Sequence, residues 1–213
     1  MGRRIWNPAG SQEASPSGEL ARLARSHRFA SVLDAGCGWG RNLAALATTA
    51  DVLHGFDLDE EGVRATRKRL AGAGTAAGPG GTAEVRIWVD DLLTAAPGRT
   101  YELVICYGVL HFLPRERRLA AYDRLESWTA PGGVLALASF NAAVPVPADL
   151  RELIPEPPAD SGEVRERFAR WEDVYVRSHV FEDEHEGGVR HTHSIDRLVV
   201  RAPRRTGGET GQG

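Results

Sequence analysis

Several features that would restrict the function are missing from this sequence. Its 213 residues contain no run of about 18 consecutive apolar residues, so we expect no transmembrane helix. Residues 1–18 hold two arginines but no apolar core of a secretory signal, which favours a cytoplasmic protein. The two cysteines, Cys37 and Cys106, are too few for a disulfide framework or for the three-cysteine cradle of an iron–sulfur cluster. Their spacing is also not that of a structural zinc site.

An excess of basic charge is missing as well. The chain has 26 lysines and arginines against 29 aspartates and glutamates, which gives a net charge of -3. Proteins that bind nucleic acid usually present a basic face. We therefore expect a small molecule as the partner, with no nucleic acid and no membrane, and a chain that acts as a monomer or a homodimer.

Apolar runs alternate with helix-like patterns over residues 30–140. Helices are expected at 19–28, 42–50, 60–70, 114–129 and 163–171. Strands are expected at 30–34, 51–57, 84–89, 101–106 and 134–140. This alternation is typical of an α/β fold with a central parallel sheet. Two further strands, 173–181 and 192–202, flank Gly187-Gly188 and should pair as an antiparallel C-terminal hairpin at one sheet edge. The prediction is a seven-stranded, mostly parallel sheet with helices on both faces.

The remaining segments are rich in turn-forming residues. Residues 1–18 are expected to form a flexible arm and 203–213 a disordered tail, which leaves one domain at 19–202. Residues 71–82 are expected to form a flexible glycine-rich loop and Pro131-Gly-Gly133 a turn. Residues 141–158 contain five prolines and should be irregular.

The sharpest motif is Asp34-Ala-Gly36-Cys-Gly38-Trp-Gly40, between the first predicted strand and the next helix. Alternating glycines let a backbone approach a ligand closely, and open parallel sheets bind ligands beyond the carboxyl ends of their strands. The dinucleotide pattern Gly-x-Gly-x-x-Gly fails, because Arg41 stands where its last glycine belongs. A carboxylate at Asp34 would repel a pyrophosphate but suits a cationic ligand that carries an ammonium or a sulfonium group.

This run resembles the S-adenosylmethionine (SAM) motif of class I methyltransferases, which have a Rossmann-like fold. The resemblance implies that Asp57, which ends the second predicted strand, chelates the ribose hydroxyls of SAM. It also implies that Asp91, favoured over Asp90, meets the adenine amino group, with Leu92 on the ring. The full set that the resemblance assigns to the cofactor is Asp34, Gly36, Cys37, Gly38, Gly40, Asn42, Asp57, Leu58, Asp91, Leu92 and Cys106.

A finer resemblance, to the tellurite-resistance methyltransferases and their thiopurine methyltransferase relatives, covers roughly residues 19–202. It rests on Gly40-Arg41-Asn42, on Val109-Leu-His-Phe-Leu113 and on the last two predicted strands. The proline-rich residues 141–158 depart from that family's pattern. In the family this segment would lie over the substrate, so the acceptor is left open.

Two residues after the fourth predicted strand are candidate catalytic residues. His111 suits a general base, since an imidazole titrates near neutral pH, and it suits a pocket wall equally well. The hydroxyl of Tyr107 is placed to orient a nucleophile. Arg41 either binds an anionic acceptor or supports the local backbone.

Three histidines near the C-terminus are candidate substrate-binding residues. His191 and His193 lie two apart in a predicted strand and so face the same side, with His185 nearby in the sequence. Together with Glu184 they also suit a metal site. Methyl transfer from a sulfonium requires no metal, however, and none is expected.

The leading hypothesis is a SAM-dependent methyltransferase for a small-molecule acceptor, with a thiol, chalcogenide, hydroxyl or amine as the nucleophile. The chain has no Asn/Asp-Pro-Pro-Tyr/Phe run, which counts against methylation of nucleic-acid bases. The alternative is a SAM-binding protein that catalyses another reaction or is regulatory. A nicotinamide-dependent oxidoreductase is disfavoured by the missing dinucleotide motif.

Overall fold

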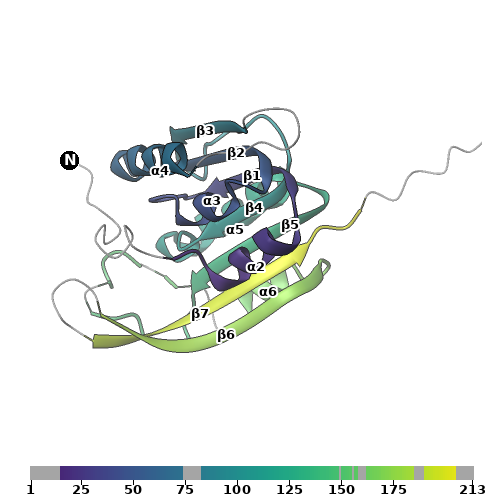
Figure 1. Cartoon of the computed structure of the whole chain (residues 1–213). Coiled ribbons are helices and arrows are strands. Elements are labelled where there is room, and N and C mark those ends of the chain that lie inside the picture. Colours follow the sequence, from purple (N-terminus) through teal and green to yellow (C-terminus); the bar gives the residue numbers. More distant parts are fainter. Residues whose placement is uncertain are drawn as a thin grey trace, which may run out of the picture.

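A seven-stranded sheet forms the centre of the computed structural model, which describes residues 15–73, 83–148, 150–154, 156–157, 162–184 and 190–204 (Figure 1). The strand order is β3-β2-β1-β4-β5-β7-β6. The parallel strands are β1 (Phe29–Ala35), β2 (Ala50–Asp57), β3 (Glu84–Val89), β4 (Tyr101–Tyr107) and β5 (Thr129–Phe140). Strand β7 (Arg190–Arg201) runs antiparallel to β5, and the edge strand β6 (Glu172–Glu184) pairs antiparallel with β7. The predicted sheet and its antiparallel hairpin are confirmed.

Helices cover both faces of this sheet, as predicted. The first face packs against α2 (Gly18–Ser26), α3 (Arg41–Leu46) and α4 (Glu60–Gly72), through side chains such as Leu20, Leu43 and Val63. The second face packs against α5 (Arg115–Trp128) and α6 (Glu163–Arg167). A short 3-10 turn, η1 (Leu110–Phe112), follows β4. None of the described helices is both long enough and apolar enough to cross a membrane.

Local sequence accounts for where the longer helices begin. The side chain of Asp59 accepts a hydrogen bond from the backbone N–H of Glu61 and so caps α4, and acidic residues in the first turn suit the helix dipole. Pro114 directly precedes α5, where its missing N–H removes no intrahelical hydrogen bond. Both helices therefore begin close to the predicted residues.

Several predicted boundaries differ from the structure, and three differences have a clear local cause. Helix α3 ends at Leu46 rather than residue 50, because Thr49 bonds back to Leu46 and Ala50 already pairs with β1. Helix α6 ends at Arg167 rather than 171. Beyond Arg167, backbone N–H groups bond to carbonyls three residues earlier instead of four, so the α-helical pattern stops. The expected turn at Pro131-Gly-Gly133 lies inside β5, at an irregularity of its pairing with β4. A Cβ on Gly133 would lie 2.8 Å from the carbonyl oxygen of Ala130, so only glycine fits there.

The proline-rich segment forms turns in its described part and contains no strand there. Most of the flexible segments expected from the sequence, namely residues 1–14, 74–82 and 205–213, lie outside the described residues. The turn at Gly187-Gly188 lies outside them as well.

Candidate functional site

The glycine loop after β1 is held from two sides. The N–H groups of Gly36 and Cys37 donate to the carbonyl of Phe56 on β2, at 2.8 and 2.9 Å. On the other side, the hydroxyl of Thr66 on α4 donates to the carbonyl of Gly38 at 2.7 Å. The loop is therefore a fixed surface at the carboxyl edge of the parallel strands.

The three glycines of this loop have different roles. All have positive φ angles, of 86°, 50° and 74° for Gly36, Gly38 and Gly40, which favour glycine. A Cβ on Gly36 would lie 2.2 Å from Val109, and one on Gly40 would lie 2.7 Å from Thr66, so both glycines allow close packing within the protein. A Cβ on Gly38 would have no atom within 4 Å. Gly38 is therefore the glycine that faces open space.

Asp34 has the most deeply buried carboxyl group of the acidic residues assigned to the cofactor. It is 1% exposed, and neither carboxylate oxygen has a hydrogen-bond partner among the described residues. Burial, with the nearby charge of Asp57, raises the pKa of Asp34 to about 7, although Arg41 acts in the opposite direction. A buried carboxylate without partners is costly, and a cationic ligand would relieve that cost.

Asp57 is oriented by the backbone. One carboxylate oxygen accepts the N–H of Gly38 at 2.8 Å, and the other accepts the N–H of Asp59 at 2.9 Å. Burial raises the pKa of Asp57 in spite of these bonds. Each oxygen keeps a further lone pair, so the carboxylate suits a pair of vicinal hydroxyls.

Asp90 and Asp91, which follow β3, differ in their hydrogen-bond partners. Asp90 accepts hydrogen bonds on both oxygens, from the indole of Trp88 and from the N–H of Asp91, each at 2.9 Å. Asp91 accepts the N–H of Leu93 at 2.8 Å and lies 3.7 Å from Arg117. Among the described residues, its second oxygen makes only this longer ion pair, and the choice of Asp91 over Asp90 stays a prediction.

The apolar cofactor candidates are divided between core and surface. Leu92 and Cys106 are buried in the core on the second sheet face, and Cys37 is buried on the first, where burial raises the pKa of its thiol. Leu58 is 59% exposed directly after Asp57, so it offers an apolar surface to a ligand. Asn42 is buried, and its side-chain oxygen accepts the N–H of Ser17 at 3.5 Å, which links α3 to the start of α2.

Tyr107 belongs to a cluster that sequence analysis missed. Its hydroxyl donates to Glu19 on α2 at 2.9 Å, and Arg197 on β7 donates to the same oxygen at 2.7 Å. Burial and the adjacent Glu19 raise the pKa of Tyr107. Burial alone would raise the pKa of Glu19, but its hydrogen bonds to Arg197 and Tyr107 lower it overall. Nothing local in the sequence links Glu19 to a strand 178 residues later.

Arg41 lies beside this cluster and beside Asp34. Burial lowers the pKa of Arg41, while the charge of Asp34 raises it. Among the described residues Arg41 makes no hydrogen bond or ion pair. It is therefore a cation available to an anionic group.

His111 is positioned as a hydrogen-bond donor. Its Nδ1 accepts the backbone N–H of Phe140 at 3.2 Å, so the neutral ring carries its proton on Nε2. Burial, with the charges of His193 and Arg118, lowers the pKa of His111 to about 3. Nε2 is buried and has no partner within the described part of the chain. This geometry favours a donor over the general base considered from the sequence.

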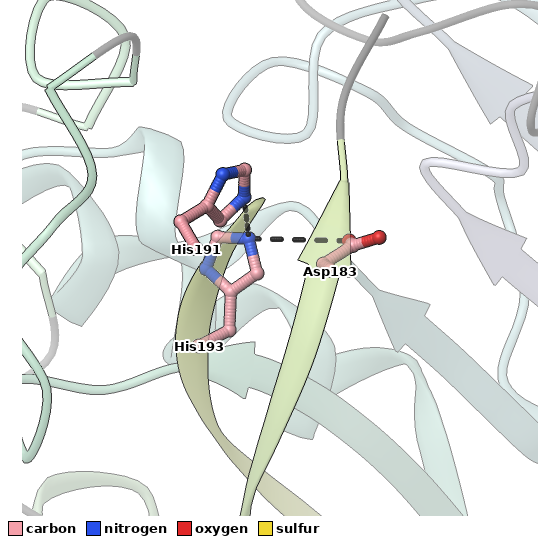
Figure 2. A group of neighbouring side chains, drawn as sticks. All are labelled: Asp183, His191 and His193. Carbon is pink, nitrogen blue, oxygen red and sulfur yellow. Dashed lines mark hydrogen bonds and ion pairs between the residues drawn. The ribbon is translucent and has the colours of Figure 1, made fainter. Parts of the chain in front are cut away.

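The hairpin brings His191 and His193 together with Asp183 (Figure 2). The two Nε2 atoms are 2.9 Å apart, and Nε2 of His193 is 3.9 Å from Oδ2 of Asp183. His185 lies outside the described residues. Sequence analysis missed Asp183, although it pairs directly with His191 in the β6–β7 register. Knowledge of the hairpin register would have identified Asp183 as a neighbour of His191.

A hollow adjoins His193 at the carboxyl end of β5. It is lined by Phe140, Asn141 and His193 and by the described part of the proline-rich segment, including Val144–Pro147, Ile154 and Pro157. The ring of His193 stacks on Phe140 with a centroid separation of 4.2 Å, and the ring of His111 also stacks on Phe140, at 4.3 Å. The proline-rich segment therefore borders the side of the site where the sequence places the acceptor.

Comparison with known proteins finds similarity to methyltransferases over part of the chain. Residues 32–133 match a family model described as a methyltransferase domain. An uncharacterized methyltransferase of Mycobacterium tuberculosis is 31% identical over 110 residues, which cover 51% of this chain and 50% of the relative. The chain thus matches about half the length of this curated relative.

Solved structures agree with this assignment at the level of the fold. TehB from Haemophilus influenzae has a TM-score of 0.72 and 20% identity, covering 87% of this chain and 62% of TehB. The N-methyltransferase NodS from Bradyrhizobium japonicum, solved with S-adenosyl-L-homocysteine (SAH), has a TM-score of 0.66 and 17% identity, covering 95% and 96% of the two chains. The predicted Rossmann-like fold, with a seven-stranded, mostly parallel sheet, is confirmed.

Proposed function

We propose that this chain, which carries a methyltransferase domain of the class I SAM-dependent fold, transfers a methyl group from SAM to a small-molecule acceptor. The observation that carries the proposal is the partnerless carboxylate of Asp34, buried beside a glycine loop in which Gly38 faces open space. SAM bears an ammonium and a sulfonium group and lacks phosphate. These properties fit a site with a buried anion and no phosphate-binding motif.

The residues around the loop fit the parts of this cofactor. Asp34 would balance the positive charge of the methionine moiety, and Asp57, oriented by two backbone N–H groups, would accept both ribose hydroxyls. Asp91 and the exposed side chain of Leu58 would meet the adenine. SAM supplies the electrophilic methyl group, and the protein has to align the acceptor with it and exclude water.

Beyond the end of β4, the described side chains offer a hydrogen-bond donor and a cation rather than a general base. Nε2–H of His111 is a donor, Tyr107 already donates to Glu19, and Arg41 is a cation without an ion pair in the described chain. A nucleophile that reacts as an anion, such as a thiolate or chalcogenide, needs no protein base. This favours such acceptors over a hydroxyl that must lose its proton during the reaction.

Calorimetric titration with SAH, and separately with NAD(H), tests the cofactor assignment. We expect micromolar binding of SAH alone. Gly38→Val should abolish that binding, because its side chain enters the space that the ligand needs. Gly98→Val is the matched control, because Gly98 also has a positive φ of 79° and no atom within 4 Å of an added Cβ, but precedes β4 at the opposite sheet edge. Normal SAH binding by Gly38→Val would overturn the site assignment.

Incubation with labelled SAM and a panel of thiols, selenols, phenols and amines then tests catalysis. Formation of SAH together with a methylated acceptor supports the proposal. Binding of SAM without methyl release across the whole panel would favour the non-methylating or regulatory alternative.

A further inference from the structure

Three potential metal ligands meet at the end of the β6–β7 hairpin where Glu184 pairs with Arg190 (Figure 2). A ring nitrogen of His191, a ring nitrogen of His193 and a carboxylate oxygen of Asp183 all lie within 4.8 Å of one another. They come from both strands, since Asp183 is on β6 and the two histidines are on β7. The hairpin ladder therefore fixes the separation of the ligands.

The printed contacts of the three side chains converge on one ring nitrogen. Here a single atom, Nε2 of His193, is the one nearest to both His191 and Asp183, at 2.9 and 3.9 Å. Two nitrogens about 2.1 Å from one ion lie about 3.0 Å apart at a right angle and about 3.4 Å apart in a tetrahedron. The observed histidine pair is already close to that spacing.

We propose that Asp183, His191 and His193 bind one divalent transition-metal ion, with Zn²⁺ as the representative ion. Two imidazoles and one carboxylate suit zinc and its neighbours, whereas Mg²⁺ and Ca²⁺ prefer oxygen ligands alone. Three protein ligands also leave coordination positions for another molecule. Methyl transfer from a sulfonium needs no metal, but this does not decide whether these three side chains bind one.

The candidate metal site adjoins the hollow at the carboxyl end of β5. His193 is 3% exposed, is stacked on Phe140 and lines the hollow bordered by the proline-rich segment. Because His193 belongs both to the ligand cluster and to the lining of that hollow, we expect the open positions of the ion to be accessible to an anionic sulfur, selenium or oxygen atom of an acceptor. Ion binding is independent of the proposed function, but its use on an acceptor rests on that function.

Metal titration of the full chain without a polyhistidine tag tests the proposal. The protein is stripped with a chelator and then titrated with Zn²⁺ by calorimetry and with Co²⁺ by visible absorption. We expect one ion per chain and the absorption bands of Co²⁺ bound to nitrogen and oxygen. Loss of an outer-shell partner alone typically weakens metal binding by about 10–100-fold, so His191→Ala and Asp183→Asn should each weaken Zn²⁺ binding by at least about 100-fold.

Controls separate this result from misfolding and from surface binding. His193 is buried, so the test relies on His191 and Asp183, which are partly exposed, with circular dichroism as the folding check. His27→Ala removes an exposed imidazole at the end of α2 and should bind Zn²⁺ like the wild type. Absence of one-to-one Zn²⁺ binding, unchanged affinity in both variants, or a preference for Mg²⁺ would each overturn the proposal.

SAH titration of the same proteins keeps the two proposals apart. His191→Ala should bind SAH as the wild type does. A wild type that binds Zn²⁺ but not SAH would contradict the proposed function and leave the metal site standing. A wild type that binds SAH but not Zn²⁺ would contradict the metal site and leave the proposed function standing.

Discussion

The two halves of the sheet build their parts of the site in different ways. Around β1 and β2, the glycine loop and Asp57 are oriented by backbone hydrogen bonds to nearby segments. Around β5, β7 and β6, the important contacts join side chains far apart in the chain, such as Glu19 with Arg197. The first half is thus specified by a local motif, and the second by tertiary packing.

This difference matches a division of chemical tasks. A cofactor common to many proteins can be bound by a short motif with fixed backbone geometry. An acceptor needs a pocket of individual shape, which loops and side chains supply. Mutations in the first half should therefore act mainly on cofactor binding, and those in the second half on stability and acceptor handling.

The largest effect is expected for Arg118→Met, in the second half. Arg118 is fully buried, donates to both oxygens of Glu163 at 2.7 and 3.0 Å, and also donates to the carbonyls of Leu113 and Glu156. Removing it leaves the mostly buried Glu163 without this partner, so the free energy of unfolding should fall by about 3–5 kcal/mol. Urea unfolding measures the change.

Arg167→Met is the matched control for this prediction. Arg167 also bonds two carboxylates, Asp123 and Glu126, but near the surface. Its loss should reduce stability by less than about 1 kcal/mol. Equal effects of the two variants would mean that burial does not set the strength of these ion pairs.

The second prediction concerns Asp34 in the first half. Its pKa is raised to about 7 in the folded protein, whereas an unfolded aspartate titrates near about 4. Between these values the folded state binds more protons than the unfolded state, so the stability of the ligand-free protein should fall as pH rises from about 4 to 7. Asp34→Asn should remove this fall and, at pH 8, add stability on the order of 4 kcal/mol.

Ligand binding should show the opposite trend at Asp34. The ammonium group of SAH favours the ionised carboxylate, so SAH affinity should weaken below about pH 7 in the wild type and lose this dependence in Asp34→Asn. Thermal unfolding and calorimetry at pH 5 and pH 8 measure both effects. If the variant is less stable than the wild type at pH 8, then Asp34 is not a destabilising group in the ligand-free protein.

Asp57→Ala gives a smaller, purely local effect. It removes the acceptor of two backbone N–H groups and the proposed partner of the ribose hydroxyls. SAH binding should weaken by about 1.5–3 kcal/mol, the range for hydrogen bonds to charged groups. Asp59→Ala is the comparison, since Asp59 also accepts a backbone N–H, but as the cap of α4. It should lower stability with little change in SAH affinity.

The same division explains which features were predictable from the sequence. The strands and helices were predictable because their sequence patterns alternate along the chain. The glycine motif and Asp57 could be related to each other because both lie within one β–α–β unit. The partnerless state of Asp34 could not be predicted, because it depends on what packs above β1. Asp183 and Glu19 were missed because their partners are set by hairpin register and by docking of α2 on β7.

The smallest effect is expected for Tyr107→Phe, where the two halves meet at the end of β4. The change deletes one hydrogen bond to Glu19 but leaves the bond from Arg197, so stability should fall by about 1 kcal/mol. Tyr175→Phe on β6 removes a more exposed hydroxyl and should be nearly neutral. If Tyr107 serves only to join α2 to the sheet, Tyr107→Phe will leave both SAH affinity and turnover close to those of the wild type. A large loss of turnover with unchanged SAH affinity would instead place its hydroxyl at the acceptor, and the junction of the two halves would then belong to the reacting centre.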